Sequence, residues 1–176
     1  MIQKFHKKLY KSHRLHKYRF ILLSLSLSLL ITAFIFHNSL QDSQTSNAQS
    51  SSIAEVVKPI IDPGNQVEEK TFHKLTRKLA HGIEFCILGC SAGGLMVSLK
   101  SVLRRYPVFM ILFCLLSTAV ADEFIQSFTG RTSNVKDILI DFSGAVVGVL
   151  LAVGIAAVVR RITGHHVQAN NGSSYR

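Results

Sequence analysis

The stretch that decides the fold is RKLAHGIEFCILGCSAGGLMVSL, residues 77–99, an apolar run with a polar cluster at one end. From Leu79 to Leu99 it carries no charged or imidazole side chain other than His81 and Glu84. About 20 apolar residues are enough for a helix to cross the hydrocarbon of a bilayer. Ionisable residues near that depth usually face protein, pair with one another and mark a functional site. The stretch therefore predicts a membrane-spanning helix that begins at a polar site.

Three further runs have the length and composition of membrane spans. Residues 20–41, 106–121 and 142–159 contain no charged residue. The chain as a whole is 48% hydrophobic, and its mean hydropathy is +0.29. We expect an all-α fold, an integral membrane four-helix bundle, with helices at about 20–37, 79–99, 106–126 and 137–159. The membrane domain is then 20–159, and no soluble domain remains.

The first helix must be distinguished from a signal peptide. Residues 1–19 are basic, an apolar run follows, and Ser-Asn-Ala at 46–48 resembles a cleavage site. The apolar core at 20–36 is longer than the hydrophobic region of a usual signal peptide, which favours a membrane anchor. N-terminal sequencing separates the two readings, because a chain that begins at Gln49 would lack the first helix.

Positive charge predicts the orientation. Short cytoplasmic loops carry an excess of Lys and Arg. The three basic clusters are residues 1–19, the loop with Lys100, Arg104 and Arg105, and the tail 160–176 with Arg160 and Arg161. We expect both termini to be cytoplasmic and the loop 38–78 to be external. The net charge of +10 fits attraction to anionic lipid, and nucleic-acid binding is disfavoured because the charges crowd against helix ends.

This topology brings the polar ends of three helices to the external face. The candidate site residues there are Arg77, Lys78, His81, Glu84, Asp122, Glu123, Gln126, Arg131, Asp137 and Asp141. With Lys74 and Lys136, five cations face five carboxylates, which predicts charge balance by pairing. Arg77, His81 and Glu84 share one helical stripe at i, i+4 and i+7.

Small residues are expected to set the packing of the second and fourth helices. Gly144 and Gly148 share a stripe with Asp137 and Asp141, and Gly89 and Gly93 lie roughly opposite the polar stripe of the second helix. Such faces allow close approach of helices in membranes. Asn134 and Asp137 can also cap the fourth helix, after a turn at Gly130.

The external loop divides into two parts. Residues 38–52 are rich in Ser and Gln, and we expect little order there. Residues 52–61 predict a short interfacial helix with a Ser52–Glu55 capping box, bent or ended by Pro59. The cysteines at 86, 90 and 114 lie in apolar runs and imply no disulfide framework.

The motifs together resemble those of the VanZ-like membrane proteins. These motifs are RKxxHxxE from Arg77, DExxQxF from Asp122, and Arg131 with Asp137, Gly144 and Gly148. The resemblance runs from about Phe36, with Asn38-Ser-Leu-Gln41, through the fourth helix. The family includes an accessory factor of teicoplanin resistance. The resemblance implies a multi-pass protein of the bacterial cytoplasmic membrane, near envelope lipids and cell-wall precursors, and it implies no particular reaction.

Three hypotheses for function follow. In the first, Arg77, Lys78 and Arg131, with Gln126, Asp137 and Asp141, bind an anionic membrane lipid or lipid-linked cell-wall precursor and modulate the envelope or glycopeptide susceptibility. In the second, the protein is a membrane enzyme that acts on a lipid-linked or phosphate-bearing substrate. His81 and Glu84 would be its acid or base, Asp122 or Glu123 would activate a hydroxyl or water, and Arg131 would stabilise negative charge. In the third, the charged set only fixes helix register; transport is the weakest reading.

No cofactor is predicted. The spacing of His and carboxylates does not demand a metal, although the same residues could hold a divalent cation. The small-residue faces permit self-association but can also be satisfied inside one bundle, so the sequence leaves the oligomeric state open.

Overall fold

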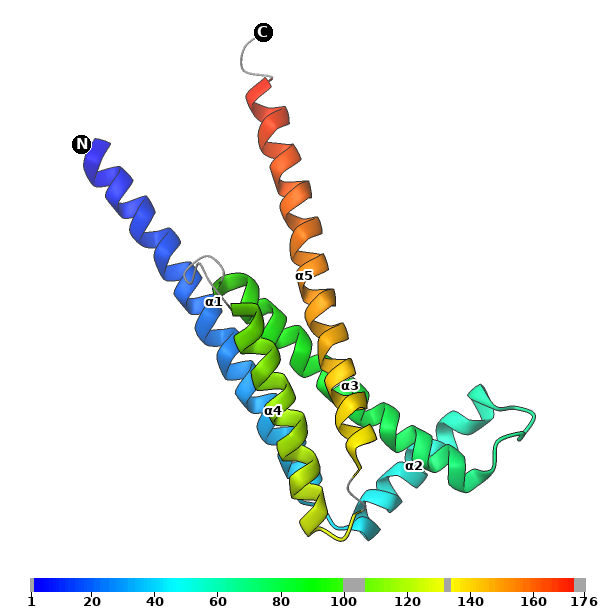
Figure 1. Cartoon of the computed structure of the whole chain (residues 1–176). Helices are drawn as coiled ribbons and strands as arrows, with labels where there is room; N and C mark the ends of the chain where they lie inside the picture. Colours follow the sequence, from blue (N-terminus) through cyan, green and yellow to red (C-terminus); the bar gives the residue numbers. More distant parts are fainter. Residues whose placement is uncertain (1, 100–106, 132–133, 173–176) are drawn as a thin grey trace.

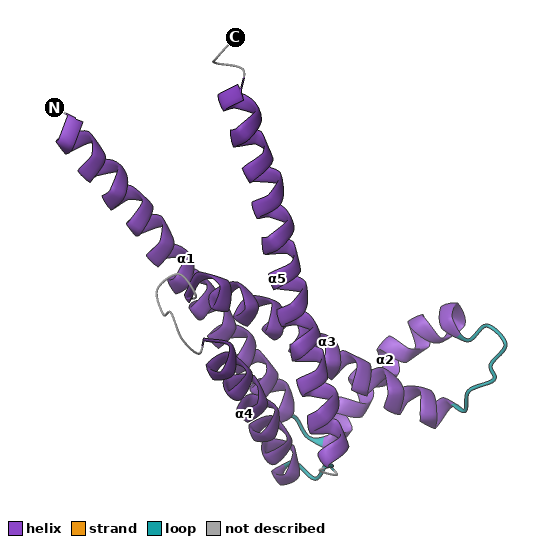
Figure 2. Cartoon of the chain, turned by 45° about the horizontal axis from the view of Figure 1, so that its top comes forward, coloured by secondary structure: helices purple, strands orange, loops and turns teal. Residues whose placement is uncertain are grey.

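A computed structural model describes residues 2–99, 107–131 and 134–172. They form five helices: α1 Ile2–Ser39, α2 Ser43–Ile61, α3 Glu69–Leu99, α4 Pro107–Phe128 and α5 Val135–Gly172 (Figure 1). Within the described ranges there is helix and loop but no strand (Figure 2). Four helices contain a stretch long and apolar enough to span a membrane: Tyr18–Ser39, Glu69–Leu99, Pro107–Phe128 and Val135–Thr163. The prediction of an all-α membrane protein with four spans is confirmed.

The helices extend beyond the apolar runs that predicted them. The second span begins at Glu69 instead of Leu79, and α5 continues from the predicted end at 159 to Gly172. The basic segment 1–19 belongs to α1 from Ile2 onward. Apolarity marks the part of a helix that lies in hydrocarbon, whereas charged residues can continue the same helix into water. The basic loop with Lys100, Arg104 and Arg105 lies outside the described residues.

The expectation of little order at 38–52 is wrong, because α2 begins at Ser43. Its N-cap is Asp42, whose side chain accepts a hydrogen bond from the backbone N–H of Thr45 at 2.7 Å. The predicted Ser52–Glu55 capping box is also wrong, since Ser52 lies inside the helix and donates to the Ala48 carbonyl at 3.1 Å. α2 packs against α3, and Ser46, Ser50 and Ala54 are buried along one face. Pro59 lies within α2, which ends at Ile61.

The helix α3 is the centre of the bundle, since it contacts α1, α2, α4 and α5. Its contact with α5 is close enough to require glycine. A Cβ atom on Gly89 would lie 2.0 Å from the Ala145 carbonyl oxygen, and one on Gly148 would lie 2.0 Å from the Cys86 carbonyl oxygen. The expected close packing through small residues is therefore observed. Apolar residues fill the remaining core, among them Ile35, Phe85, Leu88, Leu115, Ala119 and Ala145.

The first turns of α1 and the last turns of α5 extend from the same end of the bundle, and α2 lies at the other end (Figure 1). We call the end beside α2 the polar end: α1 and α4 finish there and α5 begins there. The turn into α5 uses Gly130, with a φ of 72°, as predicted. Asn134 caps α5 by accepting from the Lys136 N–H at 3.0 Å. The side of the membrane on which the polar end lies stays a prediction.

Candidate functional site

The polar end contains a small recess in which most of the predicted residues meet. Its volume is about 20 Å³, and its lining is Arg77, Lys78, His81, Glu123, Gln126, Arg131, Asp137, Ile140 and Asp141. The other two predicted residues, Glu84 and Asp122, lie beside the ring of His81. The structure thus brings all ten residues together from α3, α4, α5 and the α4–α5 loop. Their role in binding or catalysis stays a prediction.

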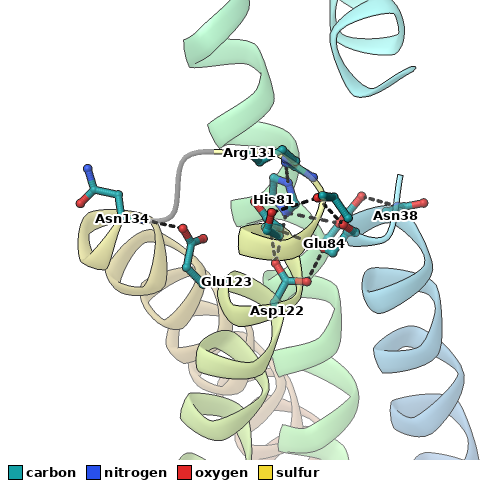
Figure 3. Close-up of polar contacts among 10 residues, drawn as sticks. Asn38, His81, Glu84, Asp122, Glu123, Arg131 and Asn134 are labelled. Carbon is teal, nitrogen blue, oxygen red and sulfur yellow. Dashed lines mark hydrogen bonds and ion pairs between the residues drawn. The ribbon is translucent and has the colours of Figure 1, made fainter. Parts of the chain in front are cut away.

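His81 is at the centre of this cluster (Figure 3). A terminal nitrogen of Arg131 lies 3.0 Å from His81 Nε2. Because a guanidinium can only donate, Nε2 must accept, and the proton of a neutral ring is then on Nδ1. Nδ1 lies 3.8 Å from Glu84 Oε2 and 3.9 Å from Asp122 Oδ2, and it has no hydrogen-bond partner within the described part of the chain. The ring is held between one guanidinium and two carboxylates.

The last residues of α1 hold two of these carboxylates in place. Asp122 is 0% exposed; its Oδ1 accepts a short hydrogen bond from the Ser39 hydroxyl, and its Oδ2 accepts from Gln126 Nε2 at 2.7 Å. Asn38 donates to Glu84 Oε1 at 3.0 Å. Asn38 and Ser39 were absent from the predicted site. The signal that could have found them is the Asn-Ser pair that ends the first apolar run, within the segment that already resembled the family.

Glu123 connects the recess to the start of α5. Its Oε1 accepts from the backbone N–H of Asn134 at 2.5 Å, where a carboxylate also complements the helix dipole. Glu123 is 2% exposed, and its Oε2 has no hydrogen-bond partner among the described residues. One of its two carboxylate oxygens is therefore available to a ligand.

Two of the three predicted anion-binding cations are already engaged. Lys78 forms a short ion pair with Asp137, and Arg131 contacts His81. Arg77 differs, because within the described residues it has neither an ion pair nor a hydrogen bond. It is half-buried and lines the recess.

A second, larger hollow opens beside the recess, between α2 and the first turns of α3. This groove has a volume of about 750 Å³. Asn47, Ser50 and Ser51 line it from α2. Its other wall consists of Glu68, Glu69, Lys70, His73, Lys74 and Arg77. Arg77 therefore lies between the groove and the recess.

The buried part of the site carries an excess of carboxylates. Lys74 and Lys136 are exposed and lie outside the recess. The predicted balance of five cations and five carboxylates therefore does not hold within the buried part. Three cations, at positions 77, 78 and 131, accompany five carboxylates, at 84, 122, 123, 137 and 141. Burial is the largest cause that lowers the pKa of Arg131, and the positive charge of Arg77 is the second. The neighbouring carboxylates oppose this shift. Buried charge without a partner is costly, so the excess calls for protons or a cation.

Three of these side chains have the arrangement of possible metal ligands. His81, Asp122 and Asp141 each offer one ligand atom, and these atoms lie within 4.8 Å of one another. Asp141 is 2% exposed, and within the described residues no hydrogen bond or ion pair to it is formed. The three residues come from α3, α4 and α5.

Four spans and a buried ionisable cluster at one end define a helical integral membrane protein with a polar site at the boundary of its spans. The model of the VanZ/LLP1 family matches residues 23–158, and the chain belongs to this family. The matched residues include the second and third predicted spans, nearly all of the first and fourth, and every residue of the recess, so the resemblance found in the sequence is confirmed. No curated protein and no solved structure matches the chain.

Proposed function

We propose that this protein binds the phosphate-bearing head group of an anionic lipid or lipid-linked cell-wall precursor in the groove between α2 and α3. The groove would face outward from a bacterial cytoplasmic membrane, and occupancy would modulate the envelope and its susceptibility to glycopeptides. The observation that carries the proposal is Arg77, a half-buried cation without an ion-pair partner within the described residues, on the wall of that groove.

The groove supports the proposal by its size and chemistry. Its volume of about 750 Å³ lies within the range of roughly 300–1,000 Å³ that is usual for small-molecule sites. Lys70, Lys74 and Arg77 offer charge-assisted hydrogen bonds from α3, and Asn47 and Ser51 offer neutral ones from α2. The recess, at about 20 Å³, has room for a water or an ion but not for a head group.

The place of the groove in the fold also fits a lipid head group. The first span ends at Ser39, and α2 starts after a short connection at Ser43. The groove therefore lies just beyond the end of the first span and beside the first turns of the second, Glu69–Leu99. We expect it near the depth of the lipid phosphates. The outward orientation rests on the basic clusters near both termini.

Binding of phosphatidylglycerol to the purified protein in nanodiscs tests this function. We expect Arg77→Gln to weaken binding by about tenfold to 100-fold, because a hydrogen bond to a charged group contributes about 1.5–3 kcal/mol. The salt dependence of binding should also fall. Lys136→Gln removes an exposed cation at the same end that does not line the groove, and should change affinity by less than about twofold. Equal affinities for wild type and Arg77→Gln would refute the assignment.

A second candidate function, acid–base catalysis, is favoured by one contact. Arg131 holds His81 Nε2, and the carboxylates of Glu84 and Asp122 face Nδ1. A carboxylate behind an imidazole is a common way to orient a catalytic base. A substrate anion that drew Arg131 away would leave Nε2 free to accept a proton. If His81→Ala and Glu123→Gln both retain every wild-type phenotype, catalysis by this cluster is excluded.

A further inference from the structure

We propose that His81, Asp122 and Asp141 form a binding site for one divalent cation of the Mn²⁺ or Zn²⁺ kind at the base of the recess. This site is separate from the head-group groove, and its existence does not depend on the proposed function.

The geometry of the three side chains fits a small ion. Their ligand atoms lie within 4.8 Å of one another. Bonds of about 2.0–2.2 Å to imidazole nitrogen and carboxylate oxygen separate ligand atoms by up to roughly 4 Å across the ion. The donors therefore need to approach by less than about 1 Å. One imidazole with two carboxylates suits Zn²⁺, Mn²⁺ or Fe²⁺ better than an alkali cation.

A fourth side chain points independently to a ligand. Glu123 is 2% exposed, lines the same recess as His81 and Asp141, and has an Oε2 atom without a hydrogen-bond partner in the described part of the chain. Buried polar atoms without a partner are rare in folded proteins. A cation in the recess, bound directly or through one water, would supply the missing partner.

Charge and volume agree with one ion of charge two. Five carboxylates and three cations leave an excess of two negative charges in the buried cluster. A divalent cation neutralises this excess without protonating a carboxylate. The recess of about 20 Å³ exceeds the roughly 10–15 Å³ that one water-sized occupant needs.

The contact between Arg131 and His81 sets a condition on binding. The Nδ1 atom of His81 faces Asp122, and it must lose its proton to bind a metal. The proton then belongs on Nε2, where Arg131 now donates. Metal binding therefore requires the guanidinium to leave Nε2. Arg131→Gln offers an amide oxygen that can accept from Nε2–H, and it should raise metal affinity.

The experiment is a Mn²⁺ titration followed by electron paramagnetic resonance, on full-length protein in neutral detergent after removal of metals with EDTA. We expect one bound Mn²⁺ per chain. Asp141→Asn and His81→Gln should each weaken binding by about 100-fold or more, and Arg131→Gln should strengthen it. Glu55→Gln, which removes an exposed carboxylate on α2 that does not line the recess, should bind like wild type.

Circular dichroism shows whether each variant keeps its helical content. If Asp141→Asn or His81→Gln loses it, the conclusion rests on whichever of these two variants stays folded. Absence of stoichiometric Mn²⁺ in wild type would overturn the site, as would unchanged affinity in a folded Asp141→Asn variant. Protons would then neutralise the excess charge. The proposed head-group binding is tested separately, by comparing wild type with Arg77→Gln in the presence of EDTA. Its outcome is independent of the Mn²⁺ result.

Discussion

A methyl group at Gly148 should separate α3 from α5 and disturb the site at their polar end. A Cβ atom at this position would lie 2.0 Å from the carbonyl oxygen of Cys86 and 2.7 Å from the backbone nitrogen of Cys90. Both atoms belong to the backbone of α3, so no side-chain rotation can relieve the contact. An ordinary contact begins at 3.4 Å, and the helices must therefore move apart by about 1.4 Å in Gly148→Ala.

The loss of folding stability follows from the disturbed packing between α3 and α5. Overpacking of a close-packed interior typically costs about 1–3 kcal/mol, and a clash between backbones belongs at the upper end of that range. We expect Gly148→Ala to lose about 2–3 kcal/mol in the free energy of unfolding, measured by SDS titration with circular dichroism. The same movement carries Asp141 away from His81, so Mn²⁺ affinity should fall as well.

The same helix offers a matched control. A Cβ atom on Gly154 would meet nothing within 4 Å. Gly154→Ala should leave stability unchanged or raise it by up to about 1 kcal/mol, because alanine is the better helix former. Equal stability of the two variants would refute the reasoning that glycine sets the distance between α3 and α5.

Three further substitutions test other contacts. Asp42→Ala should speed amide exchange in the first turn of α2. Backbone hydrogen bonds lower the pKa of Asp42, so in wild type the cap should be fully effective above the ordinary pKa of an aspartate and be lost as pH falls through the lowered one. Ser39→Ala should cost about 1–3 kcal/mol by removing a donor from buried Asp122. The exchange Lys78→Asp with Asp137→Lys should recover most of the stability that either single change loses, since it restores the ion pair.

A specific result would contradict each of these three predictions. Protection factors in the first turn of α2, which are corrected for the intrinsic pH dependence of amide exchange, should fall as Asp42 is protonated; protection that stays constant would show that Asp42 does not cap the helix. Ser127→Ala removes an exposed hydroxyl that, among the described residues, donates only to the Phe124 carbonyl of its own helix. A Ser39→Ala variant as stable as this control would exclude a structural role for the Ser39 bond. A double variant no more stable than the single ones would show that Lys78 and Asp137 do not act as a pair.

Hydropathy predicted the number of spans because the bilayer imposes a physical length on each apolar run. It could not predict where the helices end. Glu69 lies ten positions before the predicted start at Leu79, in a polar sequence whose helical state depends on packing against α2. Composition also gave a wrong prediction at 43–52, where little order was expected. This Ser-rich segment is helical because α3 covers one face of it.

The set of site residues was predictable, but their partners were not. Helical spacing placed Arg77, His81 and Glu84 on one stripe, and topology brought the ends of three spans together. Spacing within a helix carries no information about the residue that faces it from another helix. The pairing of Arg131 with His81, and of Lys78 with Asp137, therefore became visible only in three dimensions.

Arg77 makes the two proposed ligands interdependent. It lines both the groove and the recess, so its charge attracts a phosphate on one side and repels a cation on the other. A phosphate bound in the groove offsets that repulsion, and the cation should then bind more tightly. Because such coupling is reciprocal, bound Mn²⁺ must raise head-group affinity by the same factor. Arg77→Gln should bring this factor to one, whereas a factor that is unchanged in the variant would mean that the two ligands communicate by another route.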